Sequence, residues 1–255
     1  MIILIQGIRS GAGASFLAAS LSWQLSLSSK KVLALSANDS DAPLELYFNF
    51  PEPCGDGWLA AARKDAAVCS ALWHYTDSLY VLPMGKGEAA DSFWVDRSHR
   101  IKAACTLCKQ VLEEGFTDIV IDAGVASGNG RSLFNEIMNA LADYSITSAE
   151  PDAGSLMTLA GRRFASNEEV LLNKLRSESA SMREASKFLY ALPGVSEKLV
   201  PFSVPWDDLA LEAAFLSQPI SQTVPDAASA KAISSLACWI RVSNRRRQTS
   251  EGVRA

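Results

Sequence analysis

Short apolar runs alternate with longer stretches of helical periodicity along this chain. The runs have the length and composition of buried strands and are expected at Ile2–Gln6, Lys31–Ser36, Leu79–Pro83, Asp118–Asp122, Tyr144–Ala149, Val170–Asn173 and Leu199–Val204. Helices are expected from near Gly13 and over Gly57–Arg63, His99–Glu114, Ser132–Leu141, Ala153–Phe164, Asp208–Leu216 and Ala227–Val242. Strands that alternate with helices predict crossover connections and a mainly parallel sheet covered on both faces. The fold class is therefore α/β, with a three-layer doubly wound sheet, and ligands of such sheets bind beyond the carboxyl ends of the strands.

One domain is expected over residues 1–242, followed by a basic tail over residues 243–255. A chain of 255 residues with 48% hydrophobic content is long enough to bury one large core. The tail contains Arg245, Arg246 and Arg247 but lacks the apolar stripe of an interfacial helix. We expect the tail to be disordered, and a weak electrostatic contact with lipid or a partner is the alternative.

Charge and cysteine usage favour a cytoplasmic protein that does not bind nucleic acid. The 24 basic and 28 acidic residues give a net charge of -4, which does not favour binding a polyanion. The five cysteines are scattered, and the pair Cys105 and Cys108 lies in a helical pattern with no second pair to complete a zinc site. No apolar run is long enough to span a bilayer, and no basic segment precedes the first run, so we expect contact with a membrane only through partners.

A glycine-rich loop follows the first apolar run and leads into the first helical pattern. It reads GIRSGAGAS over residues 7–15. Gly11 and Gly13 allow the backbone to turn so that successive N–H groups face an anion, and the helix N-terminus adds its dipole. The candidate nucleotide-binding residues of this loop are Arg9, Ser10, Gly11, Ala12, Gly13, Ala14 and Ser15.

The loop resembles the deviant Walker A loop of the ParA/MinD group of P-loop proteins. In that group one lysine opens the loop and another follows its last glycine, whereas Arg9 and Ala14 stand at these positions here. Ser15 keeps the position of the magnesium-binding hydroxyl. A charge-assisted hydrogen bond contributes roughly 1.5–3 kcal/mol, so the absence of the second lysine weakens nucleotide binding about ten- to a hundredfold.

Two further strand ends extend the comparison with the ParA/MinD group. The second strand of that group ends in an aspartate that prepares the attacking water, and Ser36 is the corresponding residue here. The run Ile119–Gly124 keeps a Walker B-like pattern that delivers Asp122 to the magnesium region, with capping of the following turn as an equal alternative. Ser15 and Asp122 form the candidate metal site. We assign no catalytic residue and expect a pseudo-ATPase with little or no hydrolysis, in which ATP and Mg²⁺ bind weakly or not at all.

Segments along almost the whole domain resemble the BcsQ (YhjQ) type of cellulose biosynthesis accessory protein. In order and spacing, these are Leu46–Asn49, Gly57–Trp58, Leu79–Gly85, Glu150–Ala153 with Ser155, Leu171–Asn173, Val204–Asp208 and Ser217–Ile220. The resemblance implies a cytoplasmic scaffold of the cellulose and exopolysaccharide secretion machinery, docked at the inner membrane through cellulose synthase complex subunits such as BcsR, BcsE or BcsA.

The same resemblance implies a nucleotide-sandwiched dimer and two further residue roles. Arg9 would reach the phosphates bound by the second copy, with a solvated loop arginine as the alternative. Asn173 is similar to the asparagine that contacts adenine and is therefore a nucleotide-binding candidate. Trp206 is either a core anchor or a partner-facing side chain. The alternative function is an active ParA/MinD-type positioning or partition ATPase.

Overall fold

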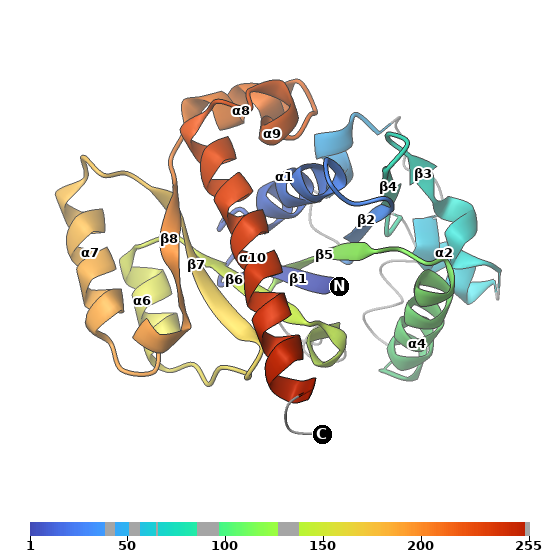
Figure 1. Cartoon of the computed structure of the whole chain (residues 1–255), viewed down its shortest axis with the longest axis horizontal. Helices are drawn as coiled ribbons and strands as arrows, with labels where there is room; N and C mark the ends of the chain where they lie inside the picture. Colours follow the sequence, from blue (N-terminus) through green and yellow to red (C-terminus); the bar gives the residue numbers. More distant parts are fainter. Residues whose placement is uncertain (39–43, 51–56, 65, 86–96, 127–137, 253–255) are drawn as a thin grey trace.

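An open, mainly parallel sheet forms the centre of the molecule in the computed structural model (Figure 1), which describes residues 1–38, 44–50, 57–64, 66–85, 97–126 and 138–252. Within these residues the strands are β1 (Ile2–Gly7), β2 (Val32–Ser36), β3 (Trp73–His74), β4 (Leu79–Leu82), β5 (Asp118–Val125), β6 (Tyr144–Ala149), β7 (Glu168–Leu175) and β8 (Leu199–Pro205). Their order is β3-β4-β2-β5-β1-β6-β7-β8, and only the β3–β4 pair is antiparallel. The predicted α/β class and parallel sheet are confirmed.

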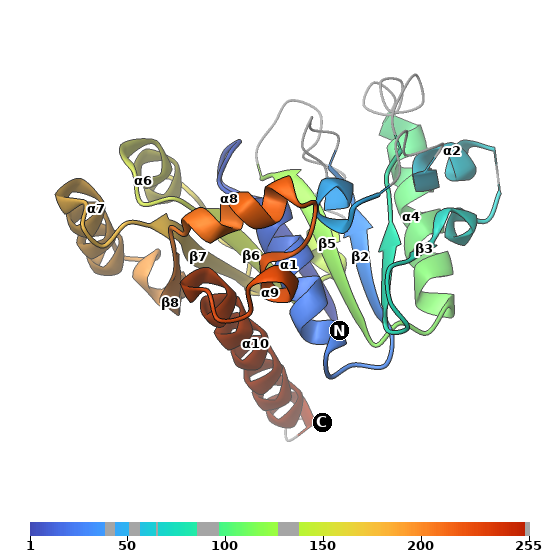
Figure 2. The ribbon, with the colours of Figure 1, turned by 90° about the horizontal axis from the view of Figure 1, so that it is seen from above.

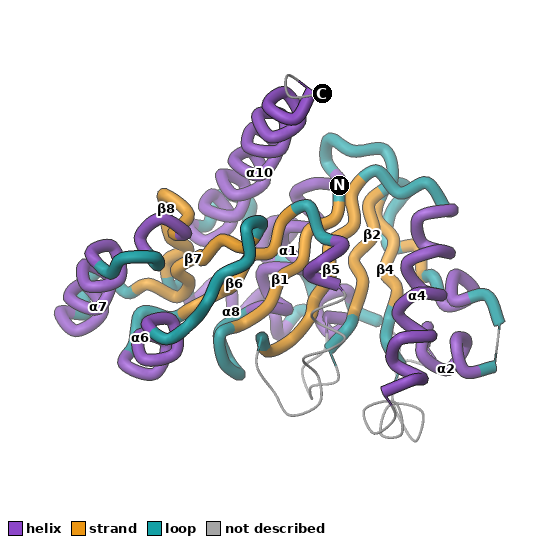
Figure 3. The backbone as a smooth tube through the Cα atoms, turned by 90° about the horizontal axis from the view of Figure 1, so that it is seen from below, coloured by secondary structure: helices purple, strands orange, loops and turns teal. Residues whose placement is uncertain are grey.

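Helices cover both faces of this sheet (Figures 2 and 3). One face carries α1 (Ala14–Ser26), α8 (Asp208–Phe215), α9 (Ile220–Thr223) and α10 (Ala228–Gly252), and the other carries α2 (Gly57–Arg63), α4 (Arg97–Glu113), α6 (Ala153–Ala160) and α7 (Ala180–Ala191). Three short 3₁₀ turns complete the order: η1 (Leu44–Phe48), η2 (Val68–Ala71) and η3 (Ser196–Lys198). No helix in the described part of the chain combines the length and the apolar character needed to cross a bilayer.

The central strand β1 shows why the apolar runs are continuous. Ile3 and Ile5 pack with α1 and α10 on one face, whereas Leu4 packs with α2 and α4 on the opposite face. All three side chains are fully buried. Because successive side chains of a strand point to opposite faces, a strand covered on both sides is mainly apolar along its length.

The helices α7 and α10 differ from the expectations. The helix α7 was not predicted, although its less exposed residues Met182, Ala185, Ser186 and Leu189 form one stripe at helical spacing, flanked by the exposed Phe188 and Tyr190. The helix α10 does not end at Val242 but continues to Gly252. This segment contains no proline, its arginines are good helix formers, and its first glycine is Gly252. The helix expected over 132–141 lies mostly outside the described residues.

Candidate functional site

The glycine-rich loop connects β1 to α1 at the carboxyl end of the sheet. Gly11 has a φ of 79° and Gly13 a φ of 87°, both in the left-handed region that favours glycine. A Cβ at Gly13 would lie 2.6 Å from the Asn173 amide nitrogen, so packing also requires glycine there. Among the described side chains, none caps the start of α1. The first N–H groups of α1 are therefore available to an anion.

A cavity of about 710 Å³ opens over this loop. Pockets of about 300–1,000 Å³ are typical for small ligands and cofactors. Every residue predicted to bind nucleotide lines it, together with residues from the ends of β2, β5 and β7 and from α8: Arg9, Ser10, Gly11, Ala12, Gly13, Ala14, Ser15, Phe16, Asn38, Tyr47, Gly124, Val125, Asn173, Lys174, Pro205, Trp206, Asp207, Ala210, Leu211, Ala214 and Ser229. The cavity therefore lies where a doubly wound sheet is expected to bind its ligand, beyond the carboxyl ends of the strands.

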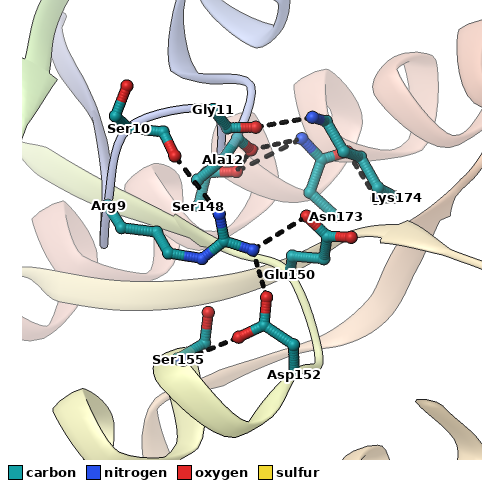
Figure 4. A network of polar contacts seen from close by, with 10 residues as sticks. All are labelled: Arg9, Ser10, Gly11, Ala12, Ser148, Glu150, Asp152, Ser155, Asn173 and Lys174. Atoms are coloured by element: carbon teal, nitrogen blue, oxygen red, sulfur yellow. Dashed lines mark hydrogen bonds and ion pairs between the residues drawn. The ribbon is translucent and has the colours of Figure 1, made fainter. Parts of the chain in front are cut away.

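Side chains from β6 and β7 hold the loop from behind (Figure 4). The Asn173 amide donates to the Ala12 carbonyl at 2.9 Å and to Ser148 Oγ at 3.2 Å, and Ser148 Oγ donates to the same carbonyl at 2.7 Å. Asn173 Oδ1 accepts from the Lys174 N–H at 2.9 Å. Asn173 is 1% exposed, and most of its hydrogen-bonding capacity serves its own chain. Its predicted contact with adenine remains a prediction.

Arg9 is engaged by two carboxylates that follow β6. Its guanidinium donates to Glu150 at 3.1 Å and also pairs with Asp152, whose other oxygen caps α6 by accepting from Ser155 N–H at 2.8 Å. Burial alone would raise the pKa of Asp152, but the hydrogen bonds from Ser155 N–H and Arg9 outweigh it and lower this pKa below its ordinary value. Arg9 is thus held by its own chain, although its side chain is 42% exposed.

Asp122 lies beneath the cavity rather than in its wall. It is fully buried, and it accepts from Gly124 N–H at 3.1 Å and from the Asn38 amide at 3.4 Å. Burial raises the pKa of Asp122, although hydrogen bonds from Ser15, Gly124 and Asn38 oppose this effect. The contact with Gly124 is the turn cap expected as one alternative. Within the described residues, no cluster of three or more His, Cys, Asp or Glu side chains could hold a metal ion by itself.

The end of β2 presents an amide to the cavity. Ser36 is fully buried and does not line the cavity, whereas Asn38 lines it and donates to Ser15 Oγ at 3.3 Å. The residue that faces the site from β2 is therefore Asn38 and not Ser36, which the sequence comparison had placed there. An amide has no basic oxygen that could take a proton from an attacking water. Asp39 and Asp41, the carboxylates considered as substitutes, lie outside the described residues.

Residues after β8 form the opposite wall. Trp206 is half-buried, Arg176 lies over its ring at 4.1 Å, and its indole N–H donates to Asp208 at 2.9 Å. The structure thus places Trp206 at the cavity and not in the core. Sequence reasoning missed Asn38 and Lys174 as site residues, although both lie at the end of a strand, where ligands of such sheets bind.

Comparison with known proteins identifies the family of this chain. The family model for cellulose biosynthesis protein BcsQ matches residues 1–240. The chain belongs to the BcsQ family. Cellulose biosynthesis protein BcsQ of Salmonella typhi is 25% identical to it over 256 residues, which cover 98% of each chain.

Solved structures similar to this BcsQ-family chain include proteins of the ParA and MinD types. A ParA family ATPase from Chlorobium tepidum has a TM-score of 0.75 and 16% identity, covering 93% of this chain and 98% of its own. The septum site-determining protein MinD from Pyrococcus horikoshii, solved in complex with Mg-ADP, has a TM-score of 0.66 and 19% identity, covering 93% of this chain and 95% of its own. At these identities the likeness shows the fold alone, and the predicted ParA/MinD fold is confirmed.

Proposed function

We propose that this BcsQ-family protein is an accessory scaffold of bacterial cellulose synthesis and secretion that binds ATP weakly and hydrolyses it little or not at all. The observation that carries the proposal is Ala14. It lies at the first position of α1 and lines the cavity, but its side chain is a methyl group, and a cation at this position would be needed to neutralise a bound phosphate. The glycine cradle supports binding, and the missing charge makes that binding weak.

The chemistry of the cavity walls supports the absence of hydrolysis. A water that attacks a phosphoryl group needs an oriented acceptor, and transition-state charge needs cations and metal. Asn38 supplies only an amide at the end of β2, and Asp122 is withdrawn beneath the wall. Neither of these two side chains therefore presents a carboxylate to a water in the cavity.

The residues fit Mg²⁺ less well than they fit a nucleotide. Mg²⁺ in such sites is held by one or two protein ligands together with substrate phosphates and waters. Ser15 lines the cavity and would supply the one direct protein ligand, whereas Asp122 would hold the metal-bound water layer or orient Ser15. When bound with ATP, the metal would neutralise phosphate charge.

A cytoplasmic location, self-association across the nucleotide and docking on cellulose synthase subunits such as BcsR, BcsE or BcsA belong to the same proposal. In a nucleotide-bridged dimer, Arg9 would have to exchange Glu150 and Asp152 for phosphates of the second copy. Its planar, permanently charged fork suits either partner.

Calorimetry with Mg-ATP, run beside a phosphate-release assay, tests the proposal. We expect weak binding to the natural chain, binding about ten- to a hundredfold tighter for Ala14→Lys, and phosphate release at background for both. Release well above background by the natural chain would favour the positioning ATPase instead. Undetectable heat at millimolar nucleotide would leave a nucleotide-free scaffold.

A cellulose assay in a strain that lacks the gene tests the scaffold role. Complementation by the natural chain and failure of an empty vector are expected. Gly13→Val, which places a side chain against Asn173, removes the cradle. Loss of cellulose with this folded variant would mean that nucleotide binding is required, and full complementation would mean that it is not.

A further inference from the structure

The cavity contains two cations from the described residues, and they differ in how they are paired. Arg9 is neutralised by Glu150 and Asp152. Lys174 lines the cavity, and among the described residues no carboxylate lies within ion-pair distance of its ammonium. Its Nζ instead donates to the Gly11 carbonyl at 2.5 Å (Figure 4). Lys174 is therefore the cation whose charge is not already compensated by a carboxylate.

The backbone of Lys174 directs this side chain over the phosphate loop. Its φ of 58° lies in the left-handed region, which a lysine rarely adopts. Strained backbone of this kind gathers at functional sites. The stem crosses the loop closely, because a Cβ at Gly13 would lie 3.6 Å from Lys174 Cε. The lysine thus covers the part of the loop from Gly11 to Gly13, beside the free N–H groups that begin α1.

We propose that Lys174 supplies the phosphate-directed positive charge that residue 14 lacks. An ammonium has three donors, so Lys174 can keep its bond to the Gly11 carbonyl and direct the other two to phosphate oxygens. The loop offers little obstruction, since Gly11 carries no side chain and Ala14 ends in a methyl group. The ligand class is a nucleoside phosphate, and the proposal rests on nucleotide binding as set out above.

Asp207, the acidic side chain among the described residues that line the cavity, does not compete for Lys174. Asp207 accepts from Leu209 N–H at 3.1 Å and, with its other oxygen, from the N–H and hydroxyl of Ser229 at 3.1 and 3.0 Å. Both of its oxygens are thereby committed to the starts of α8 and α10. The ammonium of Lys174 is left to a ligand that carries negative charge.

The test is calorimetry of three variants with Mg-ATP and with adenosine. Lys174→Asn removes the charge and keeps a residue that tolerates the left-handed backbone. We expect it to weaken Mg-ATP binding about tenfold, in line with the loss of one charge-assisted hydrogen bond, and to leave adenosine binding unchanged. Lys174→Arg should bind Mg-ATP nearly as the natural chain does. The control Lys187→Asn makes the same charge change on the exposed surface of α7 and should have no effect.

The double variant Ala14→Lys/Lys174→Asn distinguishes a Lys174 that binds phosphate by its charge from a Lys174 that only braces the loop. If Lys174 acts by its charge on phosphate, the lysine at 14 restores binding to at least the natural level. A result in which restoration fails, and adenosine binding weakens with Mg-ATP, would overturn the proposal in favour of a brace for the loop. Unchanged Mg-ATP binding by Lys174→Asn would overturn the role of Lys174 and leave the proposed nucleotide site standing. Absence of Mg-ATP binding by the natural chain would overturn both the nucleotide site and the role of Lys174.

Discussion

Replacement of Asn173 by alanine tests whether β7 holds the phosphate loop in place. The change removes the two amide hydrogen bonds to Ala12 O and Ser148 Oγ and the acceptor of the Lys174 N–H. The Ala12 carbonyl keeps one donor, because Ser148 Oγ lies 2.7 Å away. The Lys174 N–H is left without this partner.

The expected cost follows from these contacts. Each intramolecular hydrogen bond contributes roughly 0.5–1.5 kcal/mol net, so Asn173→Ala should lower the free energy of unfolding by about 2–3 kcal/mol. Asn173→Asp should cost more, about 3–5 kcal/mol, because it turns the donor toward Ala12 O into a second acceptor and buries a charge without a partner. In a chain of this size, about 1 kcal/mol lowers the melting temperature by roughly 2–4 °C.

Urea unfolding of both variants and of a matched control measures these losses. The control is Asn167→Ala, because Asn167 also bridges two carbonyls, those of Asn139 and Ala142 at 3.0 and 2.8 Å, but away from the loop. Both alanine variants should lose stability, whereas only Asn173→Ala should also weaken Mg-ATP binding. A loss below about 0.5 kcal/mol for Asn173→Ala, or an aspartate no worse than the alanine, would refute the bracing role.

Three other contacts give separate predictions. Burial raises the pKa of Glu45 above its ordinary value of 4.5, so the contribution of Glu45 to stability is present below that value and is lost as pH rises through the folded pKa. The melting temperature of Glu45→Gln should therefore rise relative to that of the natural chain as pH increases from 4 to 7. A difference that stays constant with pH would contradict this. Arg9→Gln should raise the pKa of Asp152, which NMR titration of the carboxyl carbon measures, while lowering stability by less than about 1 kcal/mol because the pair is partly exposed. Asp207→Ala should lower stability by about 1–2 kcal/mol in thermal unfolding, since Asp207 caps α8, and Asp207→Asn should lose clearly less.

The strands of the doubly wound sheet were predictable where apolar runs were long and buried. The β1 run and the glycine loop after it identify the cavity from local sequence alone, because turn geometry and strand burial are local properties. The helix α7 carries a stripe of its own, because Met182, Ala185, Ser186 and Leu189 recur at helical spacing on the side that packs near α6 and η3, but the exposed Phe188 and Tyr190 beside it mask this stripe in the sequence.

The wall residues were predictable only in part, for a geometrical reason. Strand ends bring distant segments together, but the sequence does not say which side chain near the end of each strand turns inward. At β2 the inward residue is Asn38 and not Ser36, and at β7 it is Lys174 as well as Asn173. The α8 wall, with Leu211 and Ala214, comes from a segment whose nearness to the loop depends on the whole fold.

The loop also shows why a glycine cradle is weaker evidence for nucleotide use than the charges around it. Gly13 is required by its contact with Asn173, while Ile8 and Ala12 are buried in the apolar cluster beneath α6 and α7. Packing alone would therefore keep this loop shape even if no nucleotide ever bound. A lysine that is held over the loop in a strained conformation, with no carboxylate partner among the described residues, is not explained by such packing, since glycine or asparagine would adopt this backbone with less strain. The position of Lys174 is thus the feature that best separates a site that still binds phosphate from a loop that only fills space.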